Sequence, residues 1–463
     1  MALARVRDRL SRGLRFFRHE PAFNQLDRMT ADSQRIAEYA QYGRWYEGYI
    51  ARGVLATGDP THLKRLKYNF CRPIVNIPAG WLAGTPIVWD VRADDGSTNE
   101  EASEAAKRIW DRSGAERAFL EAAITAGIYG DACLKVVQER DDPEALPTLE
   151  FLCPDVCFPL FGGHDHSELL ALEVAYVVTV GVEEAYTRHE YYDADGAEIF
   201  HGDTLVDRFT YEALPAVWVR NNRLPGRIYG TSDLNGLVDL IDEYDHVARK
   251  QTSIIDYYAN PRIVFEGVTR GTLVLDVNTA LYLPQIGQKA YFLEWSGSGP
   301  AVEDQLTRIR NAIAEIAQVP AVALGQMDKG YTTISGIGLK ILYGPLLDKV
   351  RRKQAAWGPA LERAMWLALG AMGIVVPLPS INAIFPDPTP VDPKAEVERE
   401  ALAVEKGLKS HSSAMRAIGV EDPDAELKKM VEERDMLAPP ELQAPGEERG
   451  EEEEEDEDAG RSA

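Results

Sequence analysis

The sequence predicts an α+β fold, and three features of the chain indicate it. Short runs rich in β-branched and aromatic residues, separated by turn signals, occupy residues 131–211. Residues 232–258 and 302–317 repeat apolar side chains at the spacing of amphipathic helices. A connection with four glycines, residues 325–338, separates the second of these helices from a third, and a connection of this length usually has a function. We therefore expect strands, long helices and one functional loop in the same chain.

The composition indicates a cytoplasmic protein with several subdomains. With 463 residues and 45% hydrophobic content, the chain can bury more than one core. No apolar run reaches the ~20 residues that cross a bilayer, and the N-terminal arginines lack the apolar core of a signal peptide. The four cysteines are too few and too scattered for a disulfide framework, so we expect buried thiols at Cys71, Cys133, Cys153 and Cys157.

The formal net charge of −24 argues against a protein that grips nucleic acid through a broad basic surface. Part of this charge is local, because residues 441–463 carry eleven acidic residues and only two arginines. An acidic surface suits a conduit through which a polyanion slides, provided that a few cations are placed at a constriction. It also suits solubility alone, and composition does not separate these two interpretations.

The first half of the chain is expected to hold an arm, two helices and a group of strands. Residues 1–24 alternate arginines with apolar residues, which is typical of a mobile arm or of a basic helix that contacts nucleic acid, a membrane surface or an acidic partner. Helices are expected over residues 31–51 and 99–127. The expected strands are residues 131–138, 149–154, 170–180, 184–193, 197–201 and 203–211.

The second half is expected to alternate helices with a small β-rich insert. Ser232 or Asp233 can cap the helix that runs to residue 258, and a proline at position 261 stops it. The insert is expected to contain strands at residues 263–265, 272–275 and 290–293, followed by a helix over residues 302–317. The remaining expected elements are a helix at 345–369, a strand at 381–385, helices at 394–406 and 425–436, and a disordered tail.

No motif of an ATPase phosphate loop, a dinucleotide site, a nucleophile elbow or a zinc protease occurs in the sequence. The one cluster with a catalytic composition is His164, Asp165 and His166. In a strand the two histidines would share a face and could chelate a metal. A glycine-rich loop tip more often exposes its histidines to water. A metal-dependent hydrolase that uses this cluster is therefore the alternative to a protein without catalytic residues.

Five segments occur in an order that resembles the portal proteins of tailed bacteriophages. The sequence SGIGLK resembles the helix start that follows the tunnel loop of that family, and GTSDL looks like its entry to an earlier helix. The joint order is far more specific than any single motif, and the resemblance covers residues 25–437. The segments are residues 69–86, 230–244, 335–340, 386–393 and 410–422.

The resemblance implies an α+β portal fold divided into named regions. These are a mixed α/β wing, two long stem helices, a small β-rich clip and a helical crown. The expected boundaries are a basic arm at 1–24, the wing at 25–231, stem helix 1 at 232–259, the clip at 260–300, stem helix 2 at 301–320, the tunnel loop at 321–340, a wing helix and returning strand at 341–385, the crown at 386–437 and an acidic tail at 438–463.

The resemblance also implies a structural function without catalysis, metal or cofactor. About twelve copies would form a ring at one capsid vertex, through which double-stranded DNA passes without sequence-specific contacts during packaging and ejection. The implied partners are the terminase large subunit, a head-tail adaptor, and the major capsid and scaffolding proteins, with no membrane. The protein would belong to the virion and would assemble in the host cytoplasm.

Two groups of residues are the candidate sites under this resemblance. The tunnel loop carries side chains that can touch a phosphate backbone without reading bases, namely Lys329, Thr332, Thr333 and Ser335. The two stem helices carry cations that would form rings inside the channel, or would bridge neighbouring subunits through Asp242, Glu303 and Asp304. These cations are Arg249, Lys250, Arg308 and Arg310.

Overall fold

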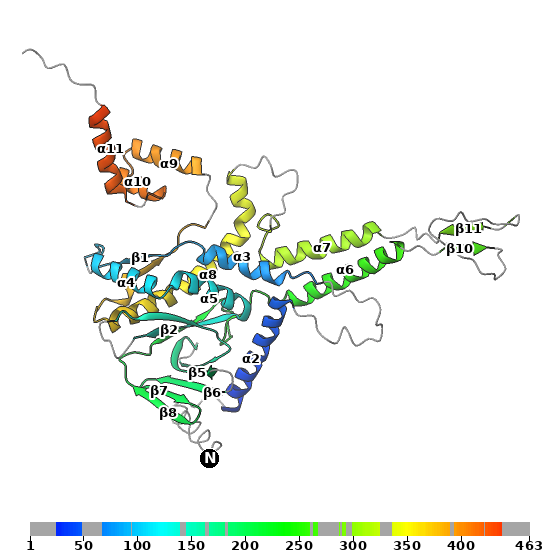
Figure 1. The fold of residues 1–463 in the computed structure, drawn as a ribbon, viewed down its shortest axis with the longest axis horizontal. Helices are drawn as coiled ribbons and strands as arrows, with labels where there is room; N and C mark the ends of the chain where they lie inside the picture. The colour runs from blue at the N-terminus through cyan, green and yellow to red at the C-terminus, as the bar shows by residue number, and fades with distance from the viewer. Residues whose placement is uncertain are drawn as a thin grey trace, which may run out of the picture. The chain divides into compact units, whose positions relative to one another are not determined.

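The structure is a computed structural model, and it describes residues 25–48, 67–93, 95–138, 145–162, 166–180, 184–259, 263–266, 287, 289–292, 299–324, 336–388, 393–420 and 422–437. The chain divides into two compact units, Met1–Pro388 and Thr389–Ala463. The first unit mixes helices and strands, which confirms the predicted α+β class (Figure 1).

Seven helices are described in the first unit. They are α2 (Gln25–Glu47), α3 (Cys71–Ala83), α4 (Glu100–Arg112), α5 (Ala115–Tyr129), α6 (Val238–Ala259), α7 (Gly299–Ala317) and α8 (Gly336–Ala371). Within these residues no helix is both long and apolar enough to cross a membrane.

The strands of the first unit form antiparallel sheets. A three-stranded sheet has the order β3 (Thr148–Leu152), β2 (Asp131–Val137), β9 (Ala216–Arg220). A five-stranded meander follows the chain through β4 (Cys157–Gly162), β5 (Glu168–Val180), β6 (Glu184–Asp193), β7 (Gly196–His201) and β8 (Thr204–Phe209). Two further pairs join β1 (Val88–Val91) to β12 (Ile381–Ile384), and β10 (Ile263–Glu266) to β11 (Lys289–Phe292).

Helix α8 is the centre of the largest apolar core. Its fully buried Trp357, Leu361 and Met365 pack in one cluster with Phe119 of α5 and Ile109 of α4. The ring centroids of Trp357 and Phe119 lie 5.0 Å apart, in the edge-to-face arrangement that aromatic pairs prefer. The second half of α8 is thereby fixed against the helices and sheets of the first unit.

A buried ion pair joins the two larger sheets. The Lys135 ammonium, on β2, donates to a carboxylate oxygen of Glu190, on β6, over 3.0 Å. Glu190 also accepts from Tyr192 and Arg188. Burial alone would raise the pKa of Glu190, but Lys135 and these hydrogen bonds hold it below its usual value. The two sheets are therefore linked by charge as well as by apolar contact.

The expectation of buried thiols holds for three of the four cysteines. Cys71, Cys133 and Cys157 are buried and Cys153 is half-buried, and all four are free. Burial raises the pKa of Cys71 to about 11, so this thiol is un-ionised near neutral pH.

Several predicted elements differ from the structure at their boundaries. The helix expected at 99–127 is two helices, because Gly114 adopts a left-handed backbone conformation with φ +55° between α4 and α5. The helix expected from residue 345 begins at Gly336, directly after the loop. Sequence reasoning missed α3, β1, β4 and β9, and the strand expected at 272–275 lies outside the described residues.

The second unit is described by three helices, α9 (Pro393–Glu405), α10 (His411–Ala417) and α11 (Pro423–Leu437). Helix α10 contacts both α9 and α11. Its first turn is capped by Ser410, whose hydroxyl accepts from the backbone N–H of Ser413 over 3.2 Å. The first and last of these helices were predicted, whereas α10 was not.

Candidate functional site at the base of the paired helices

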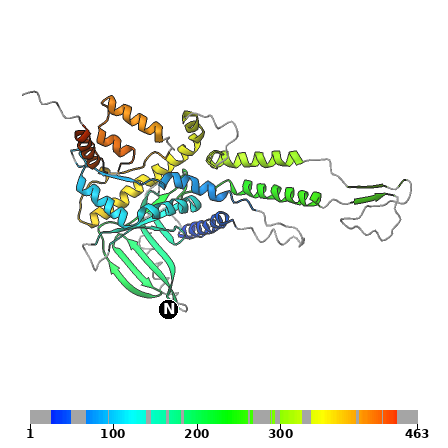
Figure 2. The same cartoon turned by 45° about the horizontal axis from the view of Figure 1, so that its top comes forward.

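Helices α6 and α7 lie side by side in both views (Figures 1 and 2). Ile241 of α6 and Ile309 and Ile313 of α7 are buried in one apolar cluster. This pairing follows from the sequence, because each helix repeats apolar residues on one side and polar residues on the others.

The sequence of the pair is acidic on balance, although one of its carboxyl groups, Asp245, is buried. The two helices carry eight acidic and four basic residues, and the four basic residues are the cations proposed from the sequence. Lys250 and Arg308 are exposed, whereas Arg249 and Arg310 are half-buried. The half-buried pair acts on neighbours in the same chain. Burial raises the pKa of Asp245, which Arg249 partly offsets, and burial raises the pKa of Tyr244, which Arg310 partly offsets.

The predicted tunnel-loop residues Lys329, Thr332, Thr333 and Ser335 lie outside the described residues. The structure does describe the two ends of this segment. Helix α7 ends at Ala317 and is followed by a turn to residue 324, and α8 begins at Gly336. The contacts between α7 and α8 therefore help to position the segment that connects these two helices.

A buried polar cluster holds the end of α7 against the middle of α8, and we call it the junction. The Lys353 ammonium on α8 lies 2.7 Å from Asp233 Oδ2, and both side chains are 1% exposed. Lys353 also donates to the Asn221 side-chain oxygen over 2.5 Å. The amides of Asn221 and Asn222 each donate to Asp233 Oδ1 over 3.1 Å. The junction consists of Asn221, Asn222, Asp233, Lys349 and Lys353.

Lys349 connects the junction to the end of α7. Its ammonium donates to the carbonyl oxygen of Ala317 over 3.0 Å and lies 3.7 Å from Asp233 Oδ1. Arg352 donates to the side-chain oxygen of Gln318, the residue after α7, which has a left-handed backbone with φ +57°. Two cations of α8 therefore hold the end of α7, one at Ala317 and one at the following Gln318. The last carbonyls of a helix have no partner within it, and cations stabilise this end.

The electrostatics of the junction favour an ionised Asp233. Burial alone would raise its pKa, but Lys353 and Lys349 hold it below the usual range. Burial lowers the pKa of Lys349, and Asp233 offsets this only in part. Removing one partner from such a buried pair leaves an uncompensated charge, which costs about 3–5 kcal/mol. The arrangement is a buried joint between the segment before α6, the end of α7 and the body of α8.

A close backbone approach positions Asp233. The backbone N–H of Asp233 and the hydroxyl of Ser232 both donate to the carbonyl oxygen of Gly127, over 2.8 and 3.1 Å. A Cβ atom at Gly127 would lie 2.8 Å from Val75 Cγ1 and 3.0 Å from Asp233 Oδ2, so only glycine leaves room here. The prediction that Ser232 or Asp233 caps the following helix is wrong, because α6 begins only at Val238 and Asp233 is turned into the core.

Sequence reasoning missed the junction lysines. Lys349 and Lys353 are four residues apart in α8 and lie among the fully or almost fully buried Leu346, Val350 and Trp357. Two cations on the apolar face of a helix require a buried anion as their partner. This pattern in the sequence could have predicted a buried ion pair on α8.

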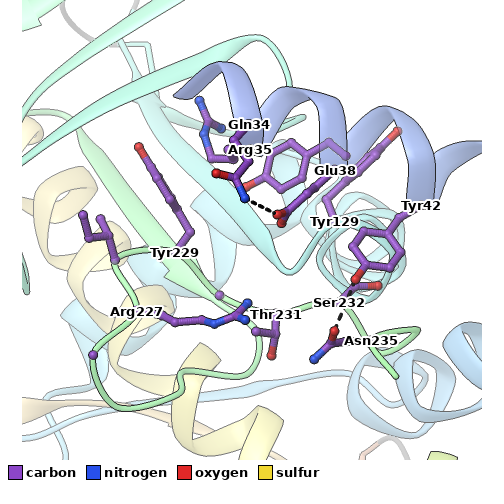
Figure 3. Close-up of a pocket in the computed structure, with 14 residues that line it drawn as sticks. Gln34, Arg35, Glu38, Tyr42, Tyr129, Arg227, Tyr229, Thr231, Ser232 and Asn235 are labelled. Carbon is purple, nitrogen blue, oxygen red and sulfur yellow. Dashed lines mark hydrogen bonds between the residues drawn. The ribbon is translucent and has the colours of Figure 1, made fainter. Parts of the chain in front are cut away.

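A pocket of about 290 Å³ lies beside the junction, between α2 and the segment that contains Ser232 (Figure 3). Gln34 donates to Glu38 within α2, and the hydroxyl of Tyr42 donates to the side-chain oxygen of Asn235 over 3.4 Å. Burial raises the pKa of Tyr129, which also lines this pocket, to about 12. The lining groups are engaged with one another, which indicates a joint between α2 and the segment before α6.

The histidine cluster does not form a metal site among the described residues. His164 and Asp165 lie outside them, and His166 has a left-handed backbone with φ 54° and accepts from Arg220 through its carbonyl oxygen. Within the described part of the chain, no group of three metal-ligating residues is close enough to hold a metal ion.

Paired amphipathic helices, antiparallel sheets and a buried charged joint make up the described part of the first unit. Residues 29–440 match the family of phage portal proteins of the SPP1 Gp6-like type, and the chain belongs to this family. It is thus a phage portal protein by family.

Among solved structures, the chain is similar to one from the virion of a native gene transfer agent particle, with 16% identity, a TM-score of 0.48, and coverage of 83% of this chain and 94% of that one. The neck of an empty gene transfer agent particle, computed with C6 symmetry, gives 16% identity, a TM-score of 0.49 and the same coverage. The neck of the native particle, computed with C12 symmetry, gives 16% identity and a TM-score of 0.44 over 76% of this chain and 91% of that one. No curated protein sequence matches the chain.

Proposed function

We propose that about twelve copies of this chain form a closed ring at one capsid vertex and that double-stranded DNA passes through its channel. Family membership supports the portal role, and the pairing of α6 and α7 on a rigid junction carries the proposal of a channel wall. A ring of identical subunits uses heterologous contacts, in which one face of each copy meets a different face of the next.

The charge of the paired helices supports a channel through which DNA slides, rather than a surface that binds DNA tightly. Six of the eight acidic residues of α6 and α7 are exposed, against two exposed and two half-buried basic residues, so the described surface of the pair is acidic. An acidic wall has few cations that could displace the counterions of a polyanion, so the polyanion would bind weakly and slide. The exposed Lys250 and Arg308 then act as isolated cations in an acidic lining, whereas the half-buried Arg249 and Arg310 support the helix pair itself.

In this assignment residues 25–231 supply the wing, α6 and α7 are the stem, and residues 321–340 form the tunnel loop with Lys329, Thr332, Thr333 and Ser335 toward DNA. The junction ties the end of α7, before that loop, to the middle of α8, after it. A force that DNA exerts on the loop would therefore act on both α7 and α8. Helix α8 would transmit this force to the core around Trp357.

The strands β10 and β11 are the proposed clip, where the terminase large subunit and the head-tail adaptor dock. They form a two-stranded antiparallel ribbon, and a ribbon of two strands is marginally stable without a partner. Docking of a second protein, or of the next subunit, would supply the missing contacts.

Mass photometry of the purified chain, followed by negative-stain microscopy, tests the ring. We expect particles with the mass of about twelve 51.4 kDa subunits and a central channel. A chain that stays monomeric at high concentration, also in the presence of capsid and scaffolding proteins, would refute the proposal.

A further inference from the structure

A buried contact near the junction sets the level of α6 relative to α7. Ile241, early in α6, lies in one apolar cluster with Ile309 and Ile313, late in α7, so the two helices run side by side in opposite directions (Figures 1 and 2). Both helices rise about 1.5 Å per residue, so each step up α6 matches a step back along α7. Residues of the two helices can therefore be compared level by level.

The side of α6 that points away from this contact carries one acidic and one basic residue at two levels. Glu243 and Lys250 each follow a buried residue, Ile241 or Ala248, by two positions, which is about 200° around a helix. Both residues are exposed. They are separated by about 10 Å along the helix, with the acidic residue nearer the junction.

The corresponding side of α7 carries the same two charges in the opposite order. Asp304 and Arg308 each precede a buried isoleucine, Ile309 or Ile313, by five positions, which turns them about 140° away from it. Both residues are exposed, and as an i, i+4 pair they share one side of the helix. Here the basic residue is nearer the junction.

The two sides are complementary in charge at both levels. Counted from the contact of Ile241 with α7, Glu243 lies at the level of Arg308 and Lys250 at the level of Asp304, within one helical turn of about 5.4 Å. Within the described part of the chain, none of these four charged residues has an ion pair. The two sides point away from each other in one copy, so their charges are available to other copies.

We propose that Arg308 of one copy faces Glu243 of the next copy in the ring, and that Asp304 faces Lys250 in the same contact. This inference rests on the ring proposed above. A rotation about the channel axis turns each copy into the next without moving it along that axis, so residues at one level in a copy stay level between copies. A heterologous contact of α7 with the next α6 therefore brings opposite charges together at both levels.

These charges would select the level at which neighbouring helix pairs meet. Exposed ion pairs contribute little stability one by one, whereas like charges across an interface suppress a wrong pairing. A displacement of about 10 Å along the helices would place Arg308 against Lys250. Nearest the junction both sides carry an exposed acid, Asp239 and Glu315, which opposes the contact, but the two matched levels outnumber this one.

Cysteine cross-linking of the assembled rings tests this contact. A chain that carries both Lys250→Cys and Asp304→Cys should give a ladder of covalent multimers with a short bis-maleimide, because each copy links to the next. The two single variants, mixed before assembly, should stop at covalent dimers that contain one chain of each kind. The unsubstituted chain reports the background of the half-buried Cys153.

The matched control moves one cysteine along the same side of α7. Glu315 is exposed and lies about 16 Å from Asp304 along the helix, toward the junction. A chain with Lys250→Cys and Glu315→Cys should therefore give no ladder. A ladder as strong as that of the first pair would overturn the inference, because the contact would then have no fixed level.

Charge exchange provides an independent measurement. Glu243→Arg should lower the assembled fraction several-fold at a concentration where half of the unsubstituted chains are in rings, and Arg308→Glu should do the same. A chain with both substitutions should return to within about twofold of the original, because opposite charges face each other again. These differences should shrink at about 1 M salt, where exposed charges are screened beyond about 3 Å.

The outcomes separate this inference from the proposed ring. Rings that form normally but give no ladder would overturn the inference and leave the ring intact. A ladder without restoration by the double charge exchange would also overturn it, because the two sides would then meet without selection by charge. Absence of rings from the unsubstituted chain would remove the proposed function and this inference together.

Discussion

The Lys353 ammonium lies 2.7 Å from the Asp233 carboxylate, and the two residues are 120 positions apart in the chain. Each side chain is 1% exposed, so the pair has no contact with solvent to compensate for a lost partner. Lys349 approaches the same carboxylate and also holds the carbonyl of Ala317. The segment before α6, the end of α7 and the body of α8 thus meet at one buried negative charge.

Replacing Lys353 by Met should destabilise the protein strongly. The substitution keeps most of the side-chain volume but leaves Asp233 with Lys349 at 3.7 Å as its remaining cation. We expect a loss of about 3–5 kcal/mol in the free energy of unfolding, measured by urea titration. Combining Lys353→Met with Asp233→Asn should recover part of this loss, because the unpaired charge is removed as well.

Arg351→Met is the matched control for that substitution. Arg351 is two residues away on α8, its side chain is 71% exposed, and its ion pair with Asp348 is at the surface. Its loss should change the free energy of unfolding by less than about 0.5 kcal/mol. Equal effects of the two substitutions would contradict a special role for the junction.

Asp233 should also make the stability of the protein depend on pH. Burial alone would raise its pKa, but Lys353 and Lys349 hold it below the unfolded value. A carboxyl group with a lowered folded pKa stabilises the protein above its unfolded pKa of about 3.9, and this contribution is lost as the pH falls through the folded pKa. The stability difference between the original chain and Asp233→Asn should therefore be full at pH 7 and shrink below about pH 4.

Urea titrations from pH 7 to pH 3 measure this difference, with Asp239→Asn as the comparison. Asp239 is exposed in the first turn of α6, so its substitution should give no comparable pH-dependent difference. A stability difference for Asp233→Asn that stays constant down to pH 3 would show that Lys349 and Lys353 do not lower the pKa of Asp233.

Gly127→Ala should destabilise the same junction through steric overlap, without any change of charge. The added Cβ atom would lie 2.8 Å from Val75 Cγ1 and 3.0 Å from Asp233 Oδ2, and both are buried. Overpacking of this kind costs about 1–3 kcal/mol, which thermal or urea unfolding would detect. Gly80→Ala is the control, because nothing lies within 4 Å of its added Cβ atom and it lies inside α3. A helix-interior alanine at Gly80 should be neutral or stabilise by about 0.5–1 kcal/mol.

The sequence predicted those parts of the fold that depend on local patterns. Helices α6 and α7 follow from apolar residues repeated at helical spacing, and strands β5 to β8 from short β-branched runs between turns. Ser232 and Asp233 show where this reasoning fails. A serine or aspartate before an apolar run usually caps a helix, but here the partners Gly127, Asn221 and Lys353 come from distant parts of the chain.

For the candidate site, the sequence predicted which helices carry the cations but not which cations are exposed, because exposure depends on distant parts of the chain. Arg249, Lys250, Arg308 and Arg310 were assigned to the correct pair of helices, but only the structure separates the exposed Lys250 and Arg308 from the half-buried Arg249 and Arg310. Burial depends on which helix packs opposite, and a single helix sequence does not contain that partner.

Reversing acidic charge on α7 should make the proposed channel retain DNA. Glu303→Lys with Asp304→Lys changes two exposed positions and raises the net charge by four per subunit, because two negative charges are replaced by two positive ones. An acidic wall lets a duplex slide, whereas each new phosphate contact steepens the salt dependence of binding by about 0.9 in the slope of log K against log salt. We expect rings of normal mass that bind double-stranded DNA more tightly at low salt and package it more slowly. Glu101→Lys with Glu104→Lys makes the same charge change at two exposed positions of α4 and should leave DNA retention unchanged. Equal retention by both variants would mean that α7 does not face the duplex, because the added charge alone would then explain the binding.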